Sequence, residues 1–569
     1  MERLASLASP VTTALAAIAL VLLFLTLGPR SGPVGPILHG PCLVLTVTSS
    51  NEKSAALGDM AAEFGRTGAV VDDKCVEVKV VQKASGDAEQ ALARGWTDAD
   101  GPRPDVWSPA ATTWIQILRV HRVGSDRSDL IPDSIPSLIQ SPLVIAMPRP
   151  MAAALGWPDR PIGWHEIYEL ARDPDGWAKV GHAEWGAFRL GKTDPTVSTS
   201  GLHALVGTYY AATSLSGDLT PDDVRRAEVV AFVKAIESSV EHYGTTAATF
   251  LANLKAADAE GKALSYVSAI AIEEKQIFDY DREASAPNVP LVAVYPRERT
   301  LVADHPYVVL RAPWVDDTKR RAAALFLEYL EHPDRQRRFQ ALGFRDHTGA
   351  AGPNLTVANG FIPSGAVAIQ PPAPETLAAI AASWSDVRKR ARVIMALDVS
   401  GSMHGQKIDL MRRSAAASLD LYANDDEVAL WTFSTDVTQV TPFVTVGSAK
   451  DRLRAQIDAL YAGGGTALYR AARDSVRSVA ATFDRTRINA VVLLTDGQNS
   501  SSDDDVEALL RDLRAANAAH PIRVFTIAYG ADADLATLRR ISDATRAASY
   551  DAKDTASINK VFREVVSNF

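Results

Sequence analysis

Alternating apolar and polar runs divide the last third of the chain into strands and helices. Apolar runs predict buried strands at Val393–Leu397, Glu427–Phe433, Ile488–Thr495 and Arg523–Ala528. Amphipathic runs between them predict helices. Because strands and helices alternate, we expect residues 391–569 to form a doubly wound α/β sheet with helices on both faces.

The preceding region has a different pattern. Short apolar strands are each followed by a small hydroxyl residue and a helical run; they lie at 43–48, 76–81 and 104–109. Two proline-bracketed strands, 141–148 and 289–296, enclose about 140 residues of helices and loops. A chain that leaves one lobe through an extended segment and returns through another builds two lobes with a hinge. We therefore expect a two-lobed domain at 42–346, followed by a linker and a docking helix at 347–390.

An uncharged apolar run lies near the start of the chain. As a helix, Val11–Gly28 would rise about 27 Å and just cross the hydrocarbon layer. We expect an uncleaved transmembrane anchor at 11–28, with residues 1–10 in the cytoplasm and the bulk of the chain extracytoplasmic. Residues 29–41, rich in Gly and Pro, would be a tether. A cleaved signal peptide is the alternative.

The two cysteines, Cys42 and Cys75, have no Cys or His neighbours of the kind that a zinc site needs. Outside the membrane we expect them to form a disulfide, with two buried free thiols as the alternative. The disulfide would close a loop of about thirty residues and contribute about 3–4 kcal/mol in the chain-entropy model.

The length and charge of the chain, and the motifs that it lacks, exclude several classes of protein. A chain of 569 residues is long enough for two or three domains. The net charge is −9 and no basic run occurs, which argues against nucleic acid as a partner. No nucleophile elbow, P-loop, zinc-protease motif or paired-cysteine motif is present, so we do not expect an enzyme.

Oxygen-bearing side chains follow two predicted strands and a glycine loop. Asp398, Ser400 and Ser402 alternate after the first strand, Asp496 follows the third, and Thr466 follows three glycines. The carboxyl end of an open α/β sheet is where such folds place their sites. Carboxylates and hydroxyls suit Mg²⁺ or Mn²⁺. The alternative role of these residues is helix capping.

These strings, D-x-S-G-S-M, the glycine loop with its Thr, and T-D-G, resemble in their order the metal-ion-dependent adhesion site of the von Willebrand factor A family. The resemblance covers about Arg392–Phe569 and implies a Rossmann-like fold. It also implies that Asp398, Ser400, Ser402, Thr466 and Asp496 hold the metal, some of them through water. An acidic residue of a protein partner would take the open coordination position.

The two-lobed region resembles the extracellular solute-binding proteins of bacterial ABC transporters over about Cys42–Arg345. The resemblance rests on short strings: Thr48-Ser49-Ser50, Ser85-Gly86, Pro104-Asp105-Val106-Trp107, Ser141-Pro142, the run 194–202, and Gly343-Phe344-Arg345. It implies a periplasmic-binding-protein-like fold with a solute in the cleft, held by loop hydroxyls and amides. By position the candidates are Ser49, Ser50, Ser85, Ser108, Ser141, Ser198, Thr199 and Ser200. Each of them can instead be a helix cap or turn residue.

Two other features of this region leave alternatives open. Tryptophans at 107, 114, 157, 164, 177 and 185 can stack on a planar ligand, although core packing is their commoner use. Glu273 and Glu274 can face the cleft, but we expect a solvated helix face.

Together these features predict a membrane-anchored extracytoplasmic binding or adhesion protein. It would hold a solute or polymer in the cleft and a protein partner through the metal. One alternative is the solute receptor of an ABC transporter, with the metal domain as a scaffold. Another is a subunit or chaperone of a cofactor-inserting complex, which an exported domain disfavours.

Overall fold

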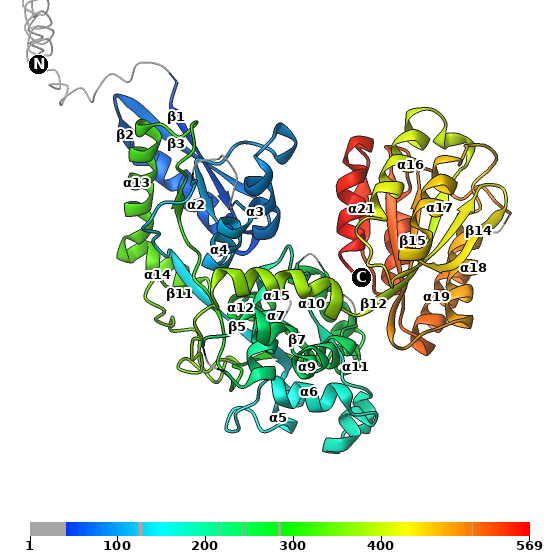
Figure 1. The fold of residues 1–569 in the computed structure, drawn as a ribbon, viewed down its shortest axis with the longest axis horizontal. Helices are drawn as coiled ribbons and strands as arrows, with labels where there is room; N and C mark the ends of the chain where they lie inside the picture. Colours follow the sequence, from blue (N-terminus) through cyan, green and yellow to red (C-terminus); the bar gives the residue numbers. More distant parts are fainter. Residues whose placement is uncertain are drawn as a thin grey trace, which may run out of the picture.

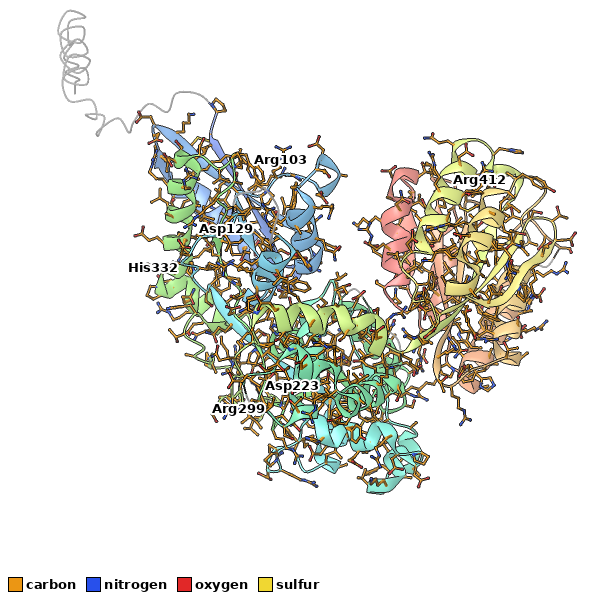
Figure 2. The ribbon with its side chains drawn as sticks, in the orientation of Figure 1. Arg103, Asp129, Asp223, Arg299, His332 and Arg412 are labelled. Carbon is orange, nitrogen blue, oxygen red and sulfur yellow. A yellow bond between two sulfur atoms is a disulfide. The ribbon has the colours of Figure 1, made fainter. Side chains whose placement is uncertain are left out.

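The computed structural model describes residues 41–569 apart from 123–128, 216, 242, 245, 283–285 and 503–504 (Figure 1). The predicted anchor at 11–28, the segment 1–10 and nearly all of the tether at 29–41 lie outside the described residues. Among the described helices, none combines the length and the apolar character that crossing a membrane requires. Figure 2 marks the three bodies of the chain with labelled residues: Arg103 and His332 on the first lobe, Asp223 and Arg299 on the second, and Arg412 on the C-terminal domain.

The first lobe is built on a five-stranded sheet of order β10-β4-β1-β3-β2. Its central strand β1 (Leu43–Ser49) runs parallel to β3 (Lys74–Gln82) and β4 (Val106–Ser108). Short strands at its two edges are β2 (Val70–Val71) and β10 (Val308–Val309). Its helices are α2 (Asn51–Arg66), α3 (Ser85–Arg94), α4 (Thr112–His121), α13 (Asp317–Glu331) and α14 (Pro333–Ala341).

A disulfide joins Cys42 to Cys75, as the sequence predicts. It links the residue before β1 to the second residue of β3. The covalent bond therefore fastens the neighbouring parallel strands where the chain enters the lobe.

The second lobe is organised around β5 (Ile139–Pro148), the first of the two predicted crossover strands. β5 pairs antiparallel with four strands: β7 (Ala269–Glu273), β8 (Leu291–Val294), β9 (Val302–Ala303) and β11 (Arg345–Asp346). β6 (Leu190–Gly191) completes the six-stranded sheet beside β7. The helices are α5 (Arg149–Ala154), α6 (Trp164–Arg172), α7 (Thr199–Thr213), α8 (Pro221–Arg225), α9 (Ala227–Ser238), α10 (Ala247–Ala259), α11 (Ala263–Tyr266) and α12 (Glu274–Arg282).

The tryptophans of these lobes serve packing. Trp107, Trp114, Trp164 and Trp177 are buried to 2% exposure or less. Trp157 is 9% exposed, and Trp185 packs edge-on against Trp177 with 5.2 Å between the ring centroids. These side chains belong to the apolar core, which is the commoner of the two uses considered.

The C-terminal domain is a six-stranded sheet of order β14-β13-β12-β15-β16-β17. Five strands are parallel: β12 (Arg390–Asp398), β13 (Glu427–Phe433), β15 (Arg487–Thr495), β16 (Ile522–Tyr529) and β17 (Ser549–Ala552). Val393 and Met395 of β12 pack on one face of the sheet, and Ile394 and Ala396 pack on the other. Helices cover both faces: α16 (Gln406–Ser418), α17 (Val446–Asp458) and α21 (Ile558–Val566) on one, α18 (Leu468–Ala481), α19 (Val506–Ala519) and α20 (Leu535–Ala544) on the other.

The sheet has six strands, two more than the four that the apolar runs predict. β14 (Val437–Thr445) pairs antiparallel with β13 at the edge, and β17 was not predicted at all. β14 has only one fully buried residue, Thr441, so it lacks the apolar run that marks the inner strands. β17 is only four residues long.

Helix α15 (Pro374–Val387) connects the three bodies, and Figure 1 shows it lying across the second lobe. It packs on α4 of the first lobe and on α7, α8 and α9 of the second, and the chain then enters β12. Trp384 of α15 meets Tyr243 edge-on with 4.7 Å between the ring centroids. The Tyr243 N–H donates to the carbonyl of Asn568 over 3.1 Å. The C-terminal domain is therefore seated on the second lobe through direct contacts.

Candidate metal centre and ligand cleft

Two neighbouring strands bring the predicted carboxylates together. Asp398 is the last residue of β12, and Asp496 directly follows β15. The register pairs Leu397 with Leu494, so the two parallel strands end side by side. Both carboxylates are fully buried. Their convergence is what the strand-end pattern in the sequence predicts.

The three hydroxyl residues gather around these carboxylates. Ser402 donates its hydroxyl to Asp496 Oδ1 over 2.6 Å, and the hydroxyls of Ser400 and Ser402 lie 3.0 Å apart. A Cβ atom placed on Gly497 would be 3.6 Å from both Ser402 Oγ and Thr466 Oγ1. The structure thus places all five predicted residues at one end of the sheet.

The glycine loop is held against the loop that follows β12. The Gly401 N–H donates to the Gly464 carbonyl over 3.0 Å, and the Gly463 N–H donates to the Val399 carbonyl over 2.7 Å. Gly464 has a φ of 86°, a backbone conformation that favours glycine. These bonds fix the position of Thr466, two residues further on.

The donor set fits a hard divalent cation. Both oxygens of Asp398 are already oriented, because Oδ1 accepts from the Ser400 N–H over 2.7 Å and Oδ2 from the Thr495 hydroxyl over 2.5 Å. Burial, with a smaller contribution from Asp496, raises the pKa of Asp398 to about 6. Two buried carboxylates with three nearby hydroxyls form the oxygen-rich, negatively charged site that Mg²⁺ or Mn²⁺ requires.

Lys407 is a further residue at this candidate site, and the motifs in the sequence do not include it. It is the second residue of α16, and its Nζ donates to Asp496 Oδ2 over 2.6 Å. The same ammonium lies 3.9 Å from Asp532. Lys407 thus supplies a positive charge to the carboxylate pair. No local pattern marks this lysine, because an early helix position is usually solvated.

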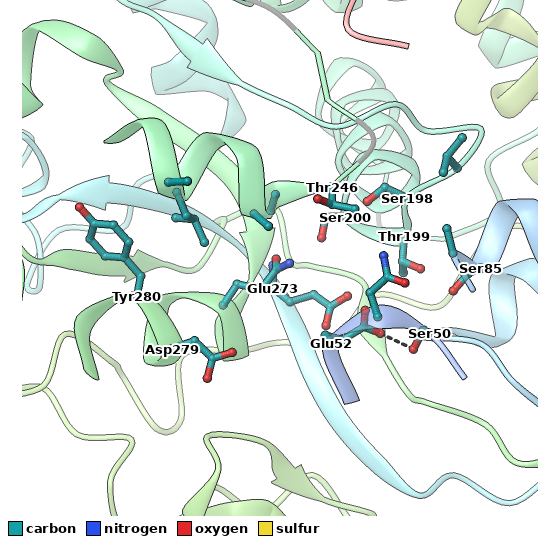
Figure 3. A pocket seen from close by; sticks show the side chains of 18 of the residues that line it. Ser50, Glu52, Ser85, Ser198, Thr199, Ser200, Thr246, Glu273, Asp279 and Tyr280 are labelled. Carbon is teal, nitrogen blue, oxygen red and sulfur yellow. Dashed lines mark hydrogen bonds between the residues drawn. The ribbon is translucent and has the colours of Figure 1, made fainter. Parts of the chain in front are cut away.

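The second candidate site is a cavity of about 860 Å³ between the two lobes. Its hydroxyl groups lie at helix starts: Ser50 precedes α2, Ser85 begins α3, and Ser198 precedes α7 (Figure 3). Thr199 and Ser200, in the first turn of α7, also line the cavity. Five of the eight predicted cleft residues are therefore on its wall.

The other three predicted residues do not line the cavity. The Ser49 hydroxyl donates to the Ser50 carbonyl over 3.1 Å, and that of Ser108 donates to the Pro306 carbonyl over 2.8 Å. Ser141 Oγ accepts from the Lys275 N–H over 3.2 Å. These three hydroxyls form hydrogen bonds with backbone groups next to the cleft. This is the local structural role that the sequence analysis kept as the alternative to ligand binding.

Two carboxylates from opposite lobes meet at the cavity wall. Figure 3 shows Glu52 of α2 and Glu273 at the end of β7 pointing toward one another. The prediction of a solvated helix face for Glu273 was wrong: its side chain is 2% exposed. Burial, and next the charge of Glu52, raise the pKa of Glu273 well above its ordinary value.

His305 lies between these two carboxylates. Its Nδ1 is 3.7 Å from Glu52 Oε1, and its Nε2 is 3.7 Å from Glu273 Oε2. Among the described residues, neither His305 Nε2 nor Glu273 Oε2 has a hydrogen-bond partner. The ammonium of Lys53 donates to Ser50 Oγ and to the Ser108 and Pro109 carbonyls and lies 3.2 Å from His305 Nδ1. Its charge also acts on both carboxylates. Glu52 and Glu273 therefore share the charge of Lys53, and one oxygen of Glu273 is left without a hydrogen-bond partner among the described residues.

The lobes touch directly at Gly86. Its N–H donates across the cleft to the Val197 carbonyl over 3.0 Å, and a Cβ at this position would lie 2.1 Å from the Thr196 carbonyl oxygen. We expect Gly86→Ala to separate the lobes at this point at a cost of about 1–3 kcal/mol, because the obstacle is backbone. Small-angle X-ray scattering would then give a larger radius of gyration than for the wild type.

Gly58→Ala is the matched control for this experiment. It lies within α2, and a Cβ there would meet nothing within 4 Å. An unchanged scattering curve for Gly86→Ala would contradict the assignment of this contact.

The fold and the two sites define a binding protein with a two-lobed solute module and a von Willebrand factor type A module. The sequence profile of the bacterial extracellular solute-binding proteins matches residues 45–345, and that of the von Willebrand factor type A domain matches residues 393–564. Because the first match covers more than half of the chain, the chain belongs to the bacterial extracellular solute-binding protein family, with a von Willebrand factor A domain at its C-terminal end.

Similar proteins cover both modules. An uncharacterised protein of Mycobacterium tuberculosis is 25% identical over 521 residues, which span 88% of this chain and 72% of the relative. A solved periplasmic thiamin binding protein is 12% identical, with a TM-score of 0.41 over 61% of this chain and 97% of its own. A von Willebrand factor type A structure from Catenulispora acidiphila is 20% identical, with a TM-score of 0.29 over 32% of this chain and 43% of its own.

Proposed function

We propose that this protein is an extracytoplasmic binding protein, anchored through residues 11–28. It would hold a solute in the inter-lobe cleft and a protein partner through Mg²⁺ or Mn²⁺. Membership of an extracellular solute-binding family supports the location outside the cytoplasm and the binding of a solute. The binding of a partner through the metal is supported by five residues that converge where two adjoining strands end: Asp398, Ser400, Ser402, Thr466 and Asp496.

The residues of the metal site have distinct roles in this proposal. Asp398 and Asp496 supply the negative charge that holds the cation, and the hydroxyls of Ser400, Ser402 and Thr466 supply neutral oxygens. Ser402 is exposed, so the site opens to solvent on its side. When bound, the metal presents a positive charge there, to which an acidic residue of the partner binds.

The test uses labelled protein lacking the first 40 residues and envelopes of cells that produce the full chain. We expect saturable binding in Mg²⁺ that EDTA removes and that Asp398→Ala lacks. Binding that is indifferent to EDTA and to this substitution would contradict a metal-dependent partner. A solute receptor docked on a transporter would then be the better description of the protein.

The carboxylates on the cavity wall favour a solute that carries a positive charge. A cationic group bound in the cavity beside Glu52 and Glu273 would partner the unpaired Glu273 oxygen and reduce the repulsion between the carboxylates. The serine and threonine hydroxyls would bind polar atoms in the rest of the solute. A volume of about 860 Å³ is that of a small-molecule site rather than that of a bare ion.

Matched probes of opposite charge test this solute class. We expect 1,4-diaminobutane to raise the melting temperature while succinate, of similar length and opposite charge, does not. Glu273→Gln should weaken diamine binding about tenfold or more, because one carboxylate of the pair is removed. Glu77→Gln, on the exposed side of β3, is the control. Binding of succinate, or diamine binding unchanged in Glu273→Gln, would contradict a cationic solute.

A further inference from the structure

A second large cavity, of about 640 Å³, lies where the second lobe meets the C-terminal domain. Residues of α10 and α11 form the lobe's side of it, and residues of α19, β16 and the turn before β17 form the other side. In Figure 1, α10 and α11 occupy the part of the lobe that faces this domain. Ala252 and Ala256 of α10 line both this cavity and the cleft, so α10 lies between the two, and none of the five candidate metal ligands lines the junction cavity.

Basic side chains dominate the wall of this cavity. Four arginines and one lysine line it: Arg189, Lys262, Arg514, Arg523 and Arg546. The first two come from the second lobe and the other three from the C-terminal domain. Both modules therefore direct positive charge into the same space.

The carboxylates on the wall do not balance this charge. Glu241 pairs with Arg523 at 3.1 Å and lies 4.0 Å from Arg189, while Glu260 pairs with Lys262 at 3.0 Å. The third carboxylate is Asp543, whose pKa is raised by burial, so three carboxylates face five basic side chains on this wall. In the described part of the chain, no carboxylate lies within ion-pair distance of Arg514 or Arg546. The wall thus carries an excess of positive charge.

Arg523 and Arg546 lie close to one another although they carry like charges. Their guanidinium carbons lie 5.8 and 5.3 Å from the centre of the Tyr266 ring. Burial and the charge of Arg523 lower the pKa of Arg546. Arg523 is 3% exposed, and its Nε has no hydrogen-bond partner among the described residues. Arg523 keeps its ion pair with Glu241, but its buried Nε has no partner, and in the described part of the chain Arg546 has no carboxylate within ion-pair distance.

We propose that this junction cavity binds a phosphate group, with Arg523 and Arg546 as its principal ligands and Arg514 at the rim. Guanidinium groups match the oxygens of phosphate in geometry as well as in charge, and a dianion would satisfy both arginines together. The cavity is larger than a single phosphate ion, so it has room for a phosphate monoester. Because both modules line the cavity, the anion held by these arginines of the C-terminal domain would lie at the junction with the second lobe.

The experiment uses the chain from residue 41 onward, in EDTA, at pH 7 and constant ionic strength. Inorganic phosphate and glycerol 3-phosphate are titrated separately, with melting temperature and calorimetry as readouts. We expect saturable binding with a rise in melting temperature. Tighter binding of glycerol 3-phosphate would identify an ester as the ligand, and tighter binding of inorganic phosphate the free anion. No saturable binding of either compound at 20 mM would overturn the proposal.

Two variants and one control assign the site. Arg546→Gln should weaken binding at least tenfold. Arg514→Gln, at an exposed position of α19, should weaken it without a risk to folding. Arg511→Gln, exposed on the same helix and absent from the cavity wall, should bind as the wild type does. Binding unchanged in both Arg546→Gln and Arg514→Gln would place the phosphate elsewhere and overturn the assignment.

Discussion

Asp398→Ala is expected to abolish detectable binding of Mg²⁺ and Mn²⁺ to the C-terminal domain, a loss of more than about a hundredfold in affinity. Asp398 ends the central strand of the sheet, and its two oxygens are oriented by Ser400 and Thr495. No other described carboxylate beside Asp496 replaces it in this donor set, and one buried carboxylate with three hydroxyls holds a divalent ion poorly.

Calorimetric titration of the wild type and the variant with each metal measures this effect. Asp436→Ala is the control, since Asp436 is exposed in the same domain and pairs with Arg470 at 3.3 Å. The control should bind as the wild type does. Saturable binding of full affinity in Asp398→Ala would show that the five residues do not form the metal site.

The same titration should depend on pH. The pKa of Asp398 is raised to about 6 in the metal-free protein, so below that value a cation must displace a proton. Affinity should therefore fall as pH falls, becoming about tenfold weaker at pH 5 than at pH 7 for one displaced proton. Affinity that is constant over this range would mean that the carboxylate is ionised throughout.

Replacing both cysteines, Cys42→Ser with Cys75→Ser, is expected to lower the free energy of unfolding of the first lobe by about 4 kcal/mol. The disulfide closes a loop across a sequence separation of 33 residues, and in the chain-entropy model this constraint on the unfolded chain gives that magnitude. The folded lobe loses no other contact, because β1 and β3 remain paired along their length.

Guanidinium unfolding followed by tryptophan fluorescence measures the change. Trp96, Trp107 and Trp114 are buried in or beside the first lobe and report on it. Unfolding of the wild type in reducing buffer is the matched comparison and should reproduce the loss. A difference below about 1 kcal/mol would show that the unfolded chain is little constrained by this loop.

The metal centre could be predicted from sequence because its residues adjoin the strongest patterns in the chain. Asp398 and Asp496 directly follow apolar runs that only buried strands explain, and parallel strands end at the same edge. Thr466 directly follows three glycines, and one of them, Gly464, has the positive φ that favours glycine. Lys407 was missed because nothing local distinguishes a lysine that reaches a carboxylate 89 residues away in sequence.

The cleft was predicted less completely. Ser50, Ser85 and Ser198 were found because helix starts at sheet edges place hydroxyls in an inter-lobe space. Glu273 was misjudged, although the apolar run from Ala269 to Ile272 could have marked it as a strand end. The junction cavity was not predictable, since Arg189 and Arg546 are brought together only by the docking of one module on another.

The contact between Lys407 and Asp496 affects the free energy that metal binding at this candidate site would have. An ammonium already contacts Asp496, so the carboxylate is not left bare when no metal is bound. Under the proposed function, metal uptake would be an exchange of one cation for another, and the affinity would be the difference between two favourable states. Removal of the metal would then weaken the binding of the partner more than it would weaken the fold of the domain.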